Sequence, residues 1–590
     1  MELNWTLKEL YGSFNGEGFK QDLEKLDKTI EKINSWCEEI TKNHDDEKFK
    51  LEEYIKRVSE FKNISNRLGS FIHLNLSTNT KNKDALKYSD ILDKKLTKCV
   101  ESFTNLEKWI SEIKNIDLII KESNLLKEHE FILKEIVKDN KYTLSSREEN
   151  IIANMENTGS SAFAKLKNTL ISTLKVDIEI DGESKELPLT EVLTMANNKD
   201  GNVRKKAYEA EIASYKKIEE PLAACLNGIK GEVITVCNLR GYKSPLDKSL
   251  IDSRMDEESL NAMLDAMKES LPIFRKYLKR KAEILGYKNG LPFYEIYAPV
   301  VEKDMTFTYE KGTAFVEKNF RTFSDNLADF ARKAIDNSWI DVYPKEGKVG
   351  GAFCSNLHFI GESRFLLNYG NSLKDVITLA HELGHGFHGE CLKKESVLNS
   401  SYPMPIAETA STFCETIIKK AAVKDASKEE SLAILESEIS GCTQVIVDIY
   451  SRFLFEKRFF EHRKESALSV SKIKELMIEA QKEAYGDGLD QNYLHPYMWT
   501  WKPHYYYAHY SFYNFPYAFG LLFAKGLYAK YLEKGKEFAT DYEKLLSITG
   551  KNNIADITNS IGIDIHDKGF WKNSLKTIEE DIEKFIKLSK

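Results

Sequence analysis

The sequence lacks any long apolar run and any closely spaced pair of cysteines. No stretch of about 18 apolar residues occurs in its 590 residues, so we expect no membrane-spanning helix. Its first residues, Met1 to Trp5, lack the charged and apolar segments of a signal peptide. The eight cysteines are scattered without a CxxC pair, which favours reduced thiols over a disulfide framework. These absences predict a cytoplasmic protein with no membrane partner.

Charge of one sign is not concentrated anywhere in the chain either. The formal net charge is −7, and the charged residues, 30% of the total, are spread along the sequence. Because there is no basic stripe, nucleic acid is not an expected partner. Only 12 prolines occur and no Pro/Gly/Ser-rich linker divides the chain, although 590 residues are enough for several domains. The sequence leaves the oligomeric state open.

Helical periodicity is the commonest pattern that is present. In the amino-terminal third, apolar residues recur three and four positions apart, for example from Phe19 to Ile40 and from Leu92 to Ile113. One β signal interrupts these stripes. Two short segments flank Asp181-Gly182, which predicts a hairpin between residues 176 and 189. We therefore predict a mainly α-helical fold that contains a small amount of sheet.

The most informative motif is H-E-x-x-H, formed by His381, Glu382 and His385. Ser372, followed three residues later by Asp375, predicts a helix that begins with a capping box and continues through the motif. Residues four apart lie on one face of a helix, so the two imidazoles can bind one Zn²⁺ while the glutamate acts on a water. The motif therefore predicts metal-assisted hydrolysis of a peptide bond.

The third metal ligand has two candidates, His388 and Glu408. His388 lies seven residues beyond His381, or about 10 Å along the helix axis, so we assign it to packing or to the surroundings of the ligands. Glu408 and Glu415 lie seven residues apart in a predicted helix of small and apolar residues (406–415), where a carboxylate needs a partner. We assign Glu408 to one Zn²⁺ site of the open His₂Glu type. Glu415 is expected to hydrogen-bond a ligand histidine.

The stretch before this helix carries a candidate strand for substrate binding. Residues 347–360 contain a glycine pair and show no helical period. A glycine-rich strand lets another backbone approach, so Gly351, Ala352 and Phe353 are candidates for binding an extended peptide by β-augmentation. The simpler interpretation is an ordinary β-hairpin through residues 361–363, and the two are compatible. Either way, we expect a small β-sheet next to the H-E-x-x-H helix.

A tyrosine-rich segment lies near the carboxyl end of the chain. Tyr510, Tyr513 and Tyr517 are three and four apart, so on a helix they form one stripe of phenols. Aimed O–H groups can stabilise the oxyanion of amide hydrolysis. For residues 505–507, aromatic core packing is the favoured interpretation.

In combination, these motifs resemble the thimet oligopeptidase and oligoendopeptidase F family of zinc peptidases, and the oligoendopeptidase F branch is the closer match. The resemblance covers essentially the whole chain. It rests on the H-E-x-x-H motif and on residues 4–11, 350–354, 365–369, 406–412 and 502–517. The family implies two helical halves around a deep channel that admits peptides and short unfolded segments. We expect an amino-terminal helical domain at residues 1–200 and a zinc peptidase domain at residues 201–590.

The resemblance also implies roles in the tyrosine-rich segment. It implies that Tyr517 and His504 contact the substrate and the transition state. The spacing in thimet-type relatives matches Tyr510 with Tyr517, whereas the oligoendopeptidase pattern points to Tyr513 with Tyr517. The sequence leaves that choice open.

The expected function is hydrolysis of internal bonds in short, unfolded oligopeptides with one Zn²⁺ as cofactor. Glu382 is expected to take the proton of the attacking water and deliver it to the leaving amine. One alternative is a carboxypeptidase or dipeptidase with the same zinc chemistry. The other is a non-catalytic protein with structural zinc, which would need a fourth protein ligand that no nearby cysteine or histidine supplies.

Overall fold

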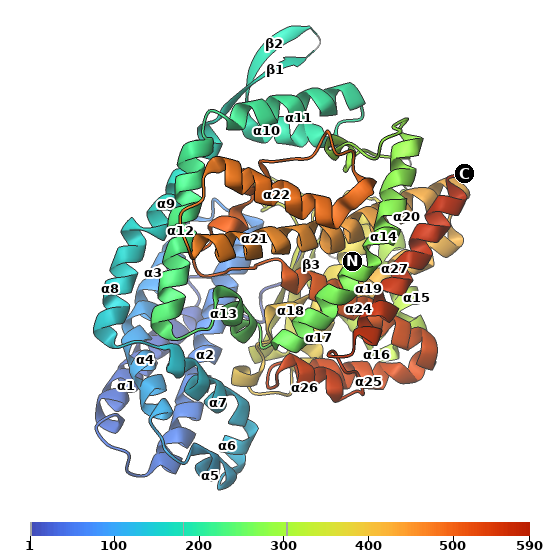
Figure 1. Ribbon diagram of the computed structural model, residues 1–590. Coiled ribbons are helices and arrows are strands. Elements are labelled where there is room, and N and C mark those ends of the chain that lie inside the picture. Colours follow the sequence, from blue (N-terminus) through green and yellow to red (C-terminus); the bar gives the residue numbers. More distant parts are fainter. Residues whose placement is uncertain (1–2, 181, 302–304) are drawn as a thin grey trace. The chain divides into compact units, whose positions relative to one another are not determined.

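Helices account for most of the chain in the computed structural model, which describes residues 3–180, 182–301 and 305–590 (Figure 1). In these ranges the strands are short and form one two-stranded and one three-stranded sheet. The predicted mainly α-helical fold is therefore confirmed. None of the helices in the same ranges is long and apolar enough to cross a membrane.

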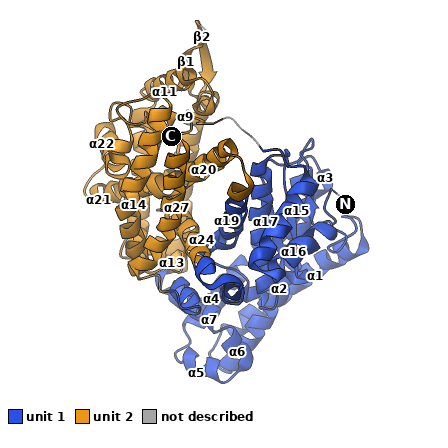
Figure 2. Cartoon of the chain, turned by 90° about the vertical axis from the view of Figure 1, so that its right-hand side faces the viewer, with its two compact units in different colours: residues 1–142, 305–421, 530–563 blue, residues 143–304, 422–529, 564–590 orange. Residues whose placement is uncertain are grey.

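The chain packs into two units, and each is assembled from separated segments of sequence (Figure 2). Unit 1 contains residues 1–142, 305–421 and 530–563, and unit 2 contains residues 143–304, 422–529 and 564–590. Helices distant in sequence thus share one core. The predicted domains, residues 1–200 and 201–590, are each one continuous segment, unlike these units. That division stays a prediction.

Unit 1 contains the H-E-x-x-H motif. Its helices are α1 (Glu17–Ile40), α2 (Glu47–Thr78), α3 (Lys83–Leu96), α4 (Val100–Ser111), α5 (Ile116–Lys121), α6 (Asn124–Glu128), α7 (Glu130–Asp139), α15 (Tyr309–Phe323), α16 (Asp325–Asp336), α17 (Leu373–Leu392), α18 (Met404–Ala407), α25 (Phe538–Ser547) and α26 (Ile554–Asn559). Helix α19 (Thr409–Asp425) begins in this unit. The apolar stripe predicted in α1 is buried, because Leu26, Ile30 and Ile33 belong to the core cluster formed with α2 and α4.

The three-stranded sheet of unit 1 lies against the motif helix. Its strands are β3 (Ile340–Asp341), β4 (Phe353–Leu357) and β5 (Glu362–Leu366), in the order β3-β5-β4. Strand β5 is parallel to β3 and antiparallel to β4, with Leu357 opposite Glu362 at the hairpin end. Gly361, with φ of 65°, closes the connection. Both β4 and β5 pack on α17. The predicted hairpin and the predicted sheet beside the motif helix are confirmed.

Unit 2 contains the tyrosine-rich segment and the second hairpin. Its elements are α8 (Ser146–Thr158), α9 (Ser160–Thr173), β1 (Lys175–Ile180), β2 (Glu183–Pro188), α10 (Leu189–Thr194), α11 (Gly201–Tyr215), α12 (Glu219–Arg240), α13 (Pro245–Asp252), α14 (Glu257–Ile284), α20 (Lys428–Thr443), α21 (Ile449–Arg463), α22 (Val470–Tyr485), α23 (Met498–Trp501), α24 (Phe515–Lys534, which ends in unit 1) and α27 (Lys568–Leu588). The predicted hairpin is confirmed, since β1 and β2 pair antiparallel with Ile180 opposite Glu183. Gly182 has φ of 80° in its turn, and Asp181 lies outside the described residues.

Candidate metal centre

Helix α17 carries the H-E-x-x-H motif and begins where the sequence predicts. The Ser372 hydroxyl accepts from the backbone N–H of Asp375 at 3.3 Å, and the Asp375 carboxylate accepts from the backbone N–H of Ser372 at 2.9 Å. The capping box is therefore formed. Val376, Leu379 and Leu383 are fully buried, which anchors the apolar face of the helix. Both motif histidines stay partly exposed.

The backbone of α17 meets the backbone of α19 at Gly384. A Cβ at this position would lie 2.6 Å from the carbonyl oxygen of Ala410 and 2.7 Å from the Cα of Ser411. Only a residue without a side chain permits this approach. The second variable position of the motif is therefore constrained by packing, and the approach brings Glu408 and Glu415 to the motif histidines.

Replacing Gly384 with alanine should destabilise unit 1 and weaken metal binding. The added methyl would meet backbone atoms that have no rotamer to change, and overpacking of this kind costs about 1–3 kcal/mol. Urea unfolding and zinc titration measure the two effects. The matched control is Gly441→Ala in α20, where a Cβ meets no atom within 4 Å. There the higher helix propensity of alanine should raise stability. Equal stability of Gly384→Ala and wild type would show that α17 and α19 do not pack this closely.

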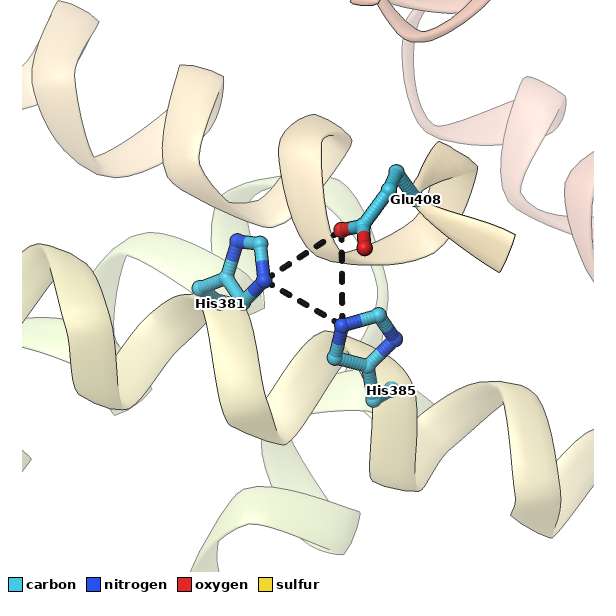
Figure 3. Close-up of side chains that lie close together, drawn as sticks. All are labelled: His381, His385 and Glu408. Atoms are coloured by element: carbon cyan, nitrogen blue, oxygen red, sulfur yellow. Dashed lines mark hydrogen bonds and ion pairs between the residues drawn. The ribbon is translucent and has the colours of Figure 1, made fainter. Parts of the chain in front are cut away.

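Three side-chain donor atoms converge beside α17 (Figure 3). The Nε2 atoms of His381 and His385 are 3.2 Å apart, and Oε2 of Glu408 lies 3.4 Å from the first and 3.5 Å from the second. Donors bound at about 2.1 Å to a tetrahedral zinc ion lie about 3.4 Å from one another. The three atoms therefore match three corners of a zinc tetrahedron and leave the fourth to water or substrate.

The protonation of these donors also fits a cation. Nδ1 of His381 lies 2.6 Å from Oε1 of Glu415, so the carboxylate holds a proton on Nδ1 and leaves a lone pair on Nε2. That lone pair faces a second imidazole nitrogen and a carboxylate oxygen. The lone pair of His381 and the carboxylate of Glu408 repel each other unless a proton or a cation lies between them. The donor set of His381, His385 and Glu408 therefore fits a divalent metal ion.

The two carboxylates beside the histidines are ionised although they are largely buried. Burial disfavours the charged form of Glu408, but the two histidines and the hydroxyl of Ser411 lower its pKa to about 2. Burial likewise opposes the charge of Glu415. Lys419, 2.6 Å away, and the hydrogen bond with the first histidine lower the pKa of Glu415 below its usual range. The resulting negative field favours a cation at the three donors.

Glu382 is the one acidic residue inside the motif. Its side chain is only 5% exposed, and burial raises the pKa of its carboxyl. No hydrogen bond ties this carboxylate to another described residue. A carboxylate that is free of partners and has a raised pKa is suited to accept and release a proton.

His388 does not belong to the donor group. It is fully buried, its Nε2 lies 2.8 Å from the hydroxyl of Thr549, and its ring stacks on Tyr402 at 3.9 Å between centroids. Burial lowers the pKa of His388 to about 3, so the ring is neutral. His388 therefore packs α17 against Tyr402 and Thr549 and takes no part in the donor group.

The candidate substrate strand lies at the edge of the three-stranded sheet. Phe353 begins β4, and Gly351, with φ of 81°, stands before it in open space. Asn368 donates to the carbonyl of Gly351 at 2.8 Å, and Ala352 is half-buried. Because β4 pairs only with β5 among the described strands, its other edge can accept a further strand.

The predicted helical stripe of Tyr510, Tyr513 and Tyr517 is wrong. Helix α24 begins at Phe515, so only Tyr517 lies on it, and the other two belong to the turns before it. Phe512 has φ of 53° there, which no helix interior allows. Tyr517 nonetheless donates its hydroxyl to that of Tyr513 at 3.1 Å, whereas Tyr510 is 60% exposed. Within unit 2, Tyr513 is therefore the phenol paired with Tyr517.

His504 lies in the same unit, in a short 3₁₀ segment. It is 6% exposed, and its Nε2 has no hydrogen-bond partner among the described residues. Burial, followed by the charges of Arg452 and Lys502, lowers the pKa of His504 to about 2. The imidazole is therefore neutral, and its ring nitrogens offer one donor and one acceptor. Tyr505 and Tyr506 are buried as predicted, but Tyr507 is 38% exposed.

A second correction concerns the segment around Glu408. The sequence predicts one helix over residues 406–415, but the structure has two: α18 ends at Ala407 and α19 begins at Thr409. Glu408 occupies the joint, with φ of −90° and ψ of 1°. Glu408 and Glu415 therefore do not share one continuous helix face, and each approaches His381 from its own element.

Three supporting residues were missed in the sequence. Lys419 follows Glu415 by one helical turn, so the i,i+4 spacing of opposite charges could have identified it. Ser411, which donates to Glu408 at 2.9 Å, also lies within a turn of its partner. Asn356 of β4 donates to the backbone carbonyl of His385 at 3.1 Å. No local sequence pattern predicts this hydrogen bond, because the bond joins a strand to a helix that is separate in the sequence.

Comparison with known proteins shows which family the chain resembles. The sequence profile of Peptidase family M3 matches residues 194–577, and that of Oligopeptidase F matches residues 112–175. Oligopeptidase PepF of Bacillus subtilis is 23% identical over 100% of this chain and 87% of its own length. An oligoendopeptidase F homolog of Borreliella burgdorferi is 24% identical over 99% of this chain and 98% of its own.

Solved structures share the fold. The crystal structure of oligoendopeptidase-F from Enterococcus faecium aligns with a TM-score of 0.69 at 17% identity, covering 97% of this chain and 98% of that one. A structure from Chlamydophila abortus aligns with a TM-score of 0.86 at 20% identity, covering 99% of this chain and 98% of that one. At such identities the likeness concerns the fold alone. The family match extends over more than half of the chain, so this chain belongs to Peptidase family M3 and is a hydrolase of peptide bonds.

Proposed function

We propose that this chain is a zinc-dependent oligoendopeptidase that cuts internal bonds of short, unfolded peptides. The observation that carries the proposal is the convergence of His381, His385 and Glu408 at tetrahedral spacing. When bound, a zinc ion supplies Lewis acidity that polarises the scissile carbonyl and acidifies water. Relatives named oligoendopeptidases support the endopeptidase assignment.

Proton transfer falls to Glu382. Its carboxylate is buried and lacks a hydrogen-bond partner among the described residues. It takes the proton of the attacking water and gives it to the leaving amine. Glu415 keeps His381 in the tautomer that presents Nε2 to the metal, and Ser411 orients Glu408.

The peptide substrate is held by its backbone. An extended peptide pairs with the free edge of β4, next to Gly351, Ala352 and Phe353. Backbone pairing selects an unfolded segment and does not read its side chains. Asn356 ties this strand to the carbonyl of His385, so the strand that holds the peptide is also fixed to the metal-binding helix.

Donors to the oxyanion come from the tyrosine-rich segment. We assign Tyr517 and His504 to contacts with the substrate and the transition state, as the family resemblance implies. Tyr513 is assigned the supporting role, because its hydroxyl is 3.1 Å from that of Tyr517. Tyr510 is assigned no role, because its side chain is exposed. A neutral His504 can donate one N–H without carrying charge into the site.

A peptide blocked at both ends tests this function. We expect an acetylated and amidated peptide of about ten residues to be cut internally, as seen from product masses. A carboxypeptidase or dipeptidase of the same zinc chemistry would leave it intact, because it needs a free terminus. Activity should disappear with a chelator and return when zinc is added. Retention of full activity in the chelator, after exhaustive dialysis, would refute the metal dependence, and cleavage confined to unblocked peptides would refute the endopeptidase assignment.

A further inference from the structure

Unit 2 contains a cavity whose lining residues take no part in the proposed reaction. It has a volume of about 300 Å³ and lies between α10, α11 and residues 495–502. Aromatic and apolar side chains form most of its wall, among them Tyr208, Phe293, Tyr294 and Met498. Such a cavity accommodates an apolar group of the size of one aromatic amino acid.

A lysine that forms no ion pair among the described residues lines this cavity. Lys502 is 8% exposed, and its Nζ lies 4.2 Å from the centroid of the Trp501 ring. A second lysine also contacts Trp501: Lys167 is 3% exposed and donates to the carbonyl of Trp501 at 3.2 Å. Within the described parts of the chain, neither ammonium forms an ion pair with a carboxylate.

The nearby carboxylates are already engaged. Asp448 pairs with Arg452. Glu211 accepts from the hydroxyl of Tyr215 at 2.9 Å and lies 3.0 Å from Nε2 of His495. Neither carboxylate forms an ion pair with Lys502, although Glu211 also lines the cavity and both carboxylates attract the ammonium from a greater distance.

Two buried ammonium groups that form no ion pair are costly for a folded protein. A buried charge is normally paired, because water no longer solvates it. The cost is visible in both lysines, since burial lowers the pKa of Lys167 to about 8 and that of Lys502 to about 8. A strongly shifted pKa in a group that lines a cavity marks a candidate functional site, and an anionic ligand would stabilise the charged form of the lysine.

We propose that this cavity binds a small carboxylate with an apolar body, with Lys502 holding the carboxylate and the aromatic wall holding the body. Lys167, which donates to the carbonyl of Trp501, adds to the positive field. Two sources offer this chemistry: a single N-blocked or deaminated amino acid, and the free carboxy-terminal residue of a peptide. None of the three converging donors lines this cavity, and its occupancy is independent of hydrolysis.

Direct binding to the full-length protein tests the proposal. N-acetyl-L-phenylalanine is the probe, and N-acetyl-L-phenylalaninamide is the matched neutral control. By calorimetry we expect one equivalent of the acid to bind with Kd of about 10 µM to 1 mM, and the amide to bind about tenfold more weakly or less. Equal binding of acid and amide, or no binding of the acid at millimolar concentration, would overturn the proposal.

Variants separate this cavity from the metal centre. Lys502→Met should lose binding of the acid by about tenfold or more, and Lys502→Arg should retain most of it. Lys502→Met should also raise the melting temperature without probe, because it removes an unpaired buried charge. His381→Ala, which dismantles the metal site, should leave binding unchanged. Binding that survives Lys502→Met but disappears in His381→Ala would assign the probe to the metal and refute the cavity.

A cavity-filling change supplies an independent check. Ala196→Phe occupies the wall contributed by the segment after α10 and keeps both lysines. It should abolish binding of the probe, and unchanged binding would contradict the location. A peptide ending in free phenylalanine distinguishes the two sources in the Glu382→Gln background, which prevents hydrolysis. If it competes with the probe, the ligand is a peptide carboxy terminus; if it does not, the ligand is a single small carboxylate.

Discussion

Replacing Glu382 with glutamine is expected to abolish hydrolysis while the protein keeps its metal. Glutamine has the same shape but cannot accept a proton from water, and general acid–base catalysis contributes about two to four orders of magnitude to rate. The residue is 5% exposed and is not one of the three converging donors, so the change should leave the metal site intact. We expect kcat/KM on a blocked peptide to fall by that factor, with zinc content by elemental analysis unchanged.

A carboxylate elsewhere in unit 1 provides the control for charge removal. Glu395 follows α17 and pairs with Lys551 at 2.6 Å, away from the three donors. Glu395→Gln should keep activity within about twofold, since an isolated partly exposed ion pair contributes about 1 kcal/mol or less to stability. If Glu382→Gln retained wild-type turnover with its full metal content, another group would be the base. Loss of zinc together with activity would instead make Glu382 a structural residue.

The parts of the site that could be predicted from sequence are those governed by local rules. Helix geometry alone places His381 and His385 on one face, and the capping box at Ser372 marks where that helix begins. The argument from rise per residue also excluded His388, which is 2.8 Å from Thr549 and outside the donor group. These features depend on residues at most a few turns apart, so no knowledge of the tertiary structure was needed.

The features that escaped prediction depend on contacts between distant segments. The position of Glu408 at the joint between α18 and α19 follows from the packing of α19 on Gly384, which the periodicity of the sequence does not reveal. The regularly spaced tyrosines do not form one helical stripe, because turns precede α24 and Phe512 adopts a left-handed conformation there. The unpaired charge of Lys502 is likewise invisible in sequence, since pairing is decided by elements hundreds of residues away. The spacing of side chains in the sequence therefore predicted which donors converge better than it predicted where helices begin and end.

The second large effect is expected at Glu408. Glu408→Ala removes one of three converging donors and the carboxylate whose charge balances the metal. Outer partners of metal ligands typically contribute about 10–100-fold to affinity, so loss of a direct ligand should cost more than loss of such a partner. We therefore expect Glu408→Ala to bind zinc more weakly than Glu415→Gln, and both more weakly than wild type, in competition with a chromogenic chelator.

The order of these affinities discriminates between the two glutamates. Glu415 contacts Nδ1 of His381 at 2.6 Å and is also paired with Lys419, so its loss misorients one ligand but leaves all three donors in place. Glu408, held at 2.9 Å by Ser411, has its Oε2 at the third corner of the donor triangle. If Glu408→Ala bound zinc as tightly as wild type, a group other than Glu408 would complete the site. If Glu415→Gln were the weaker of the two, the roles of the glutamates would be exchanged. The proposed arrangement requires the opposite order, with activity in each variant restored in proportion to the zinc that it binds.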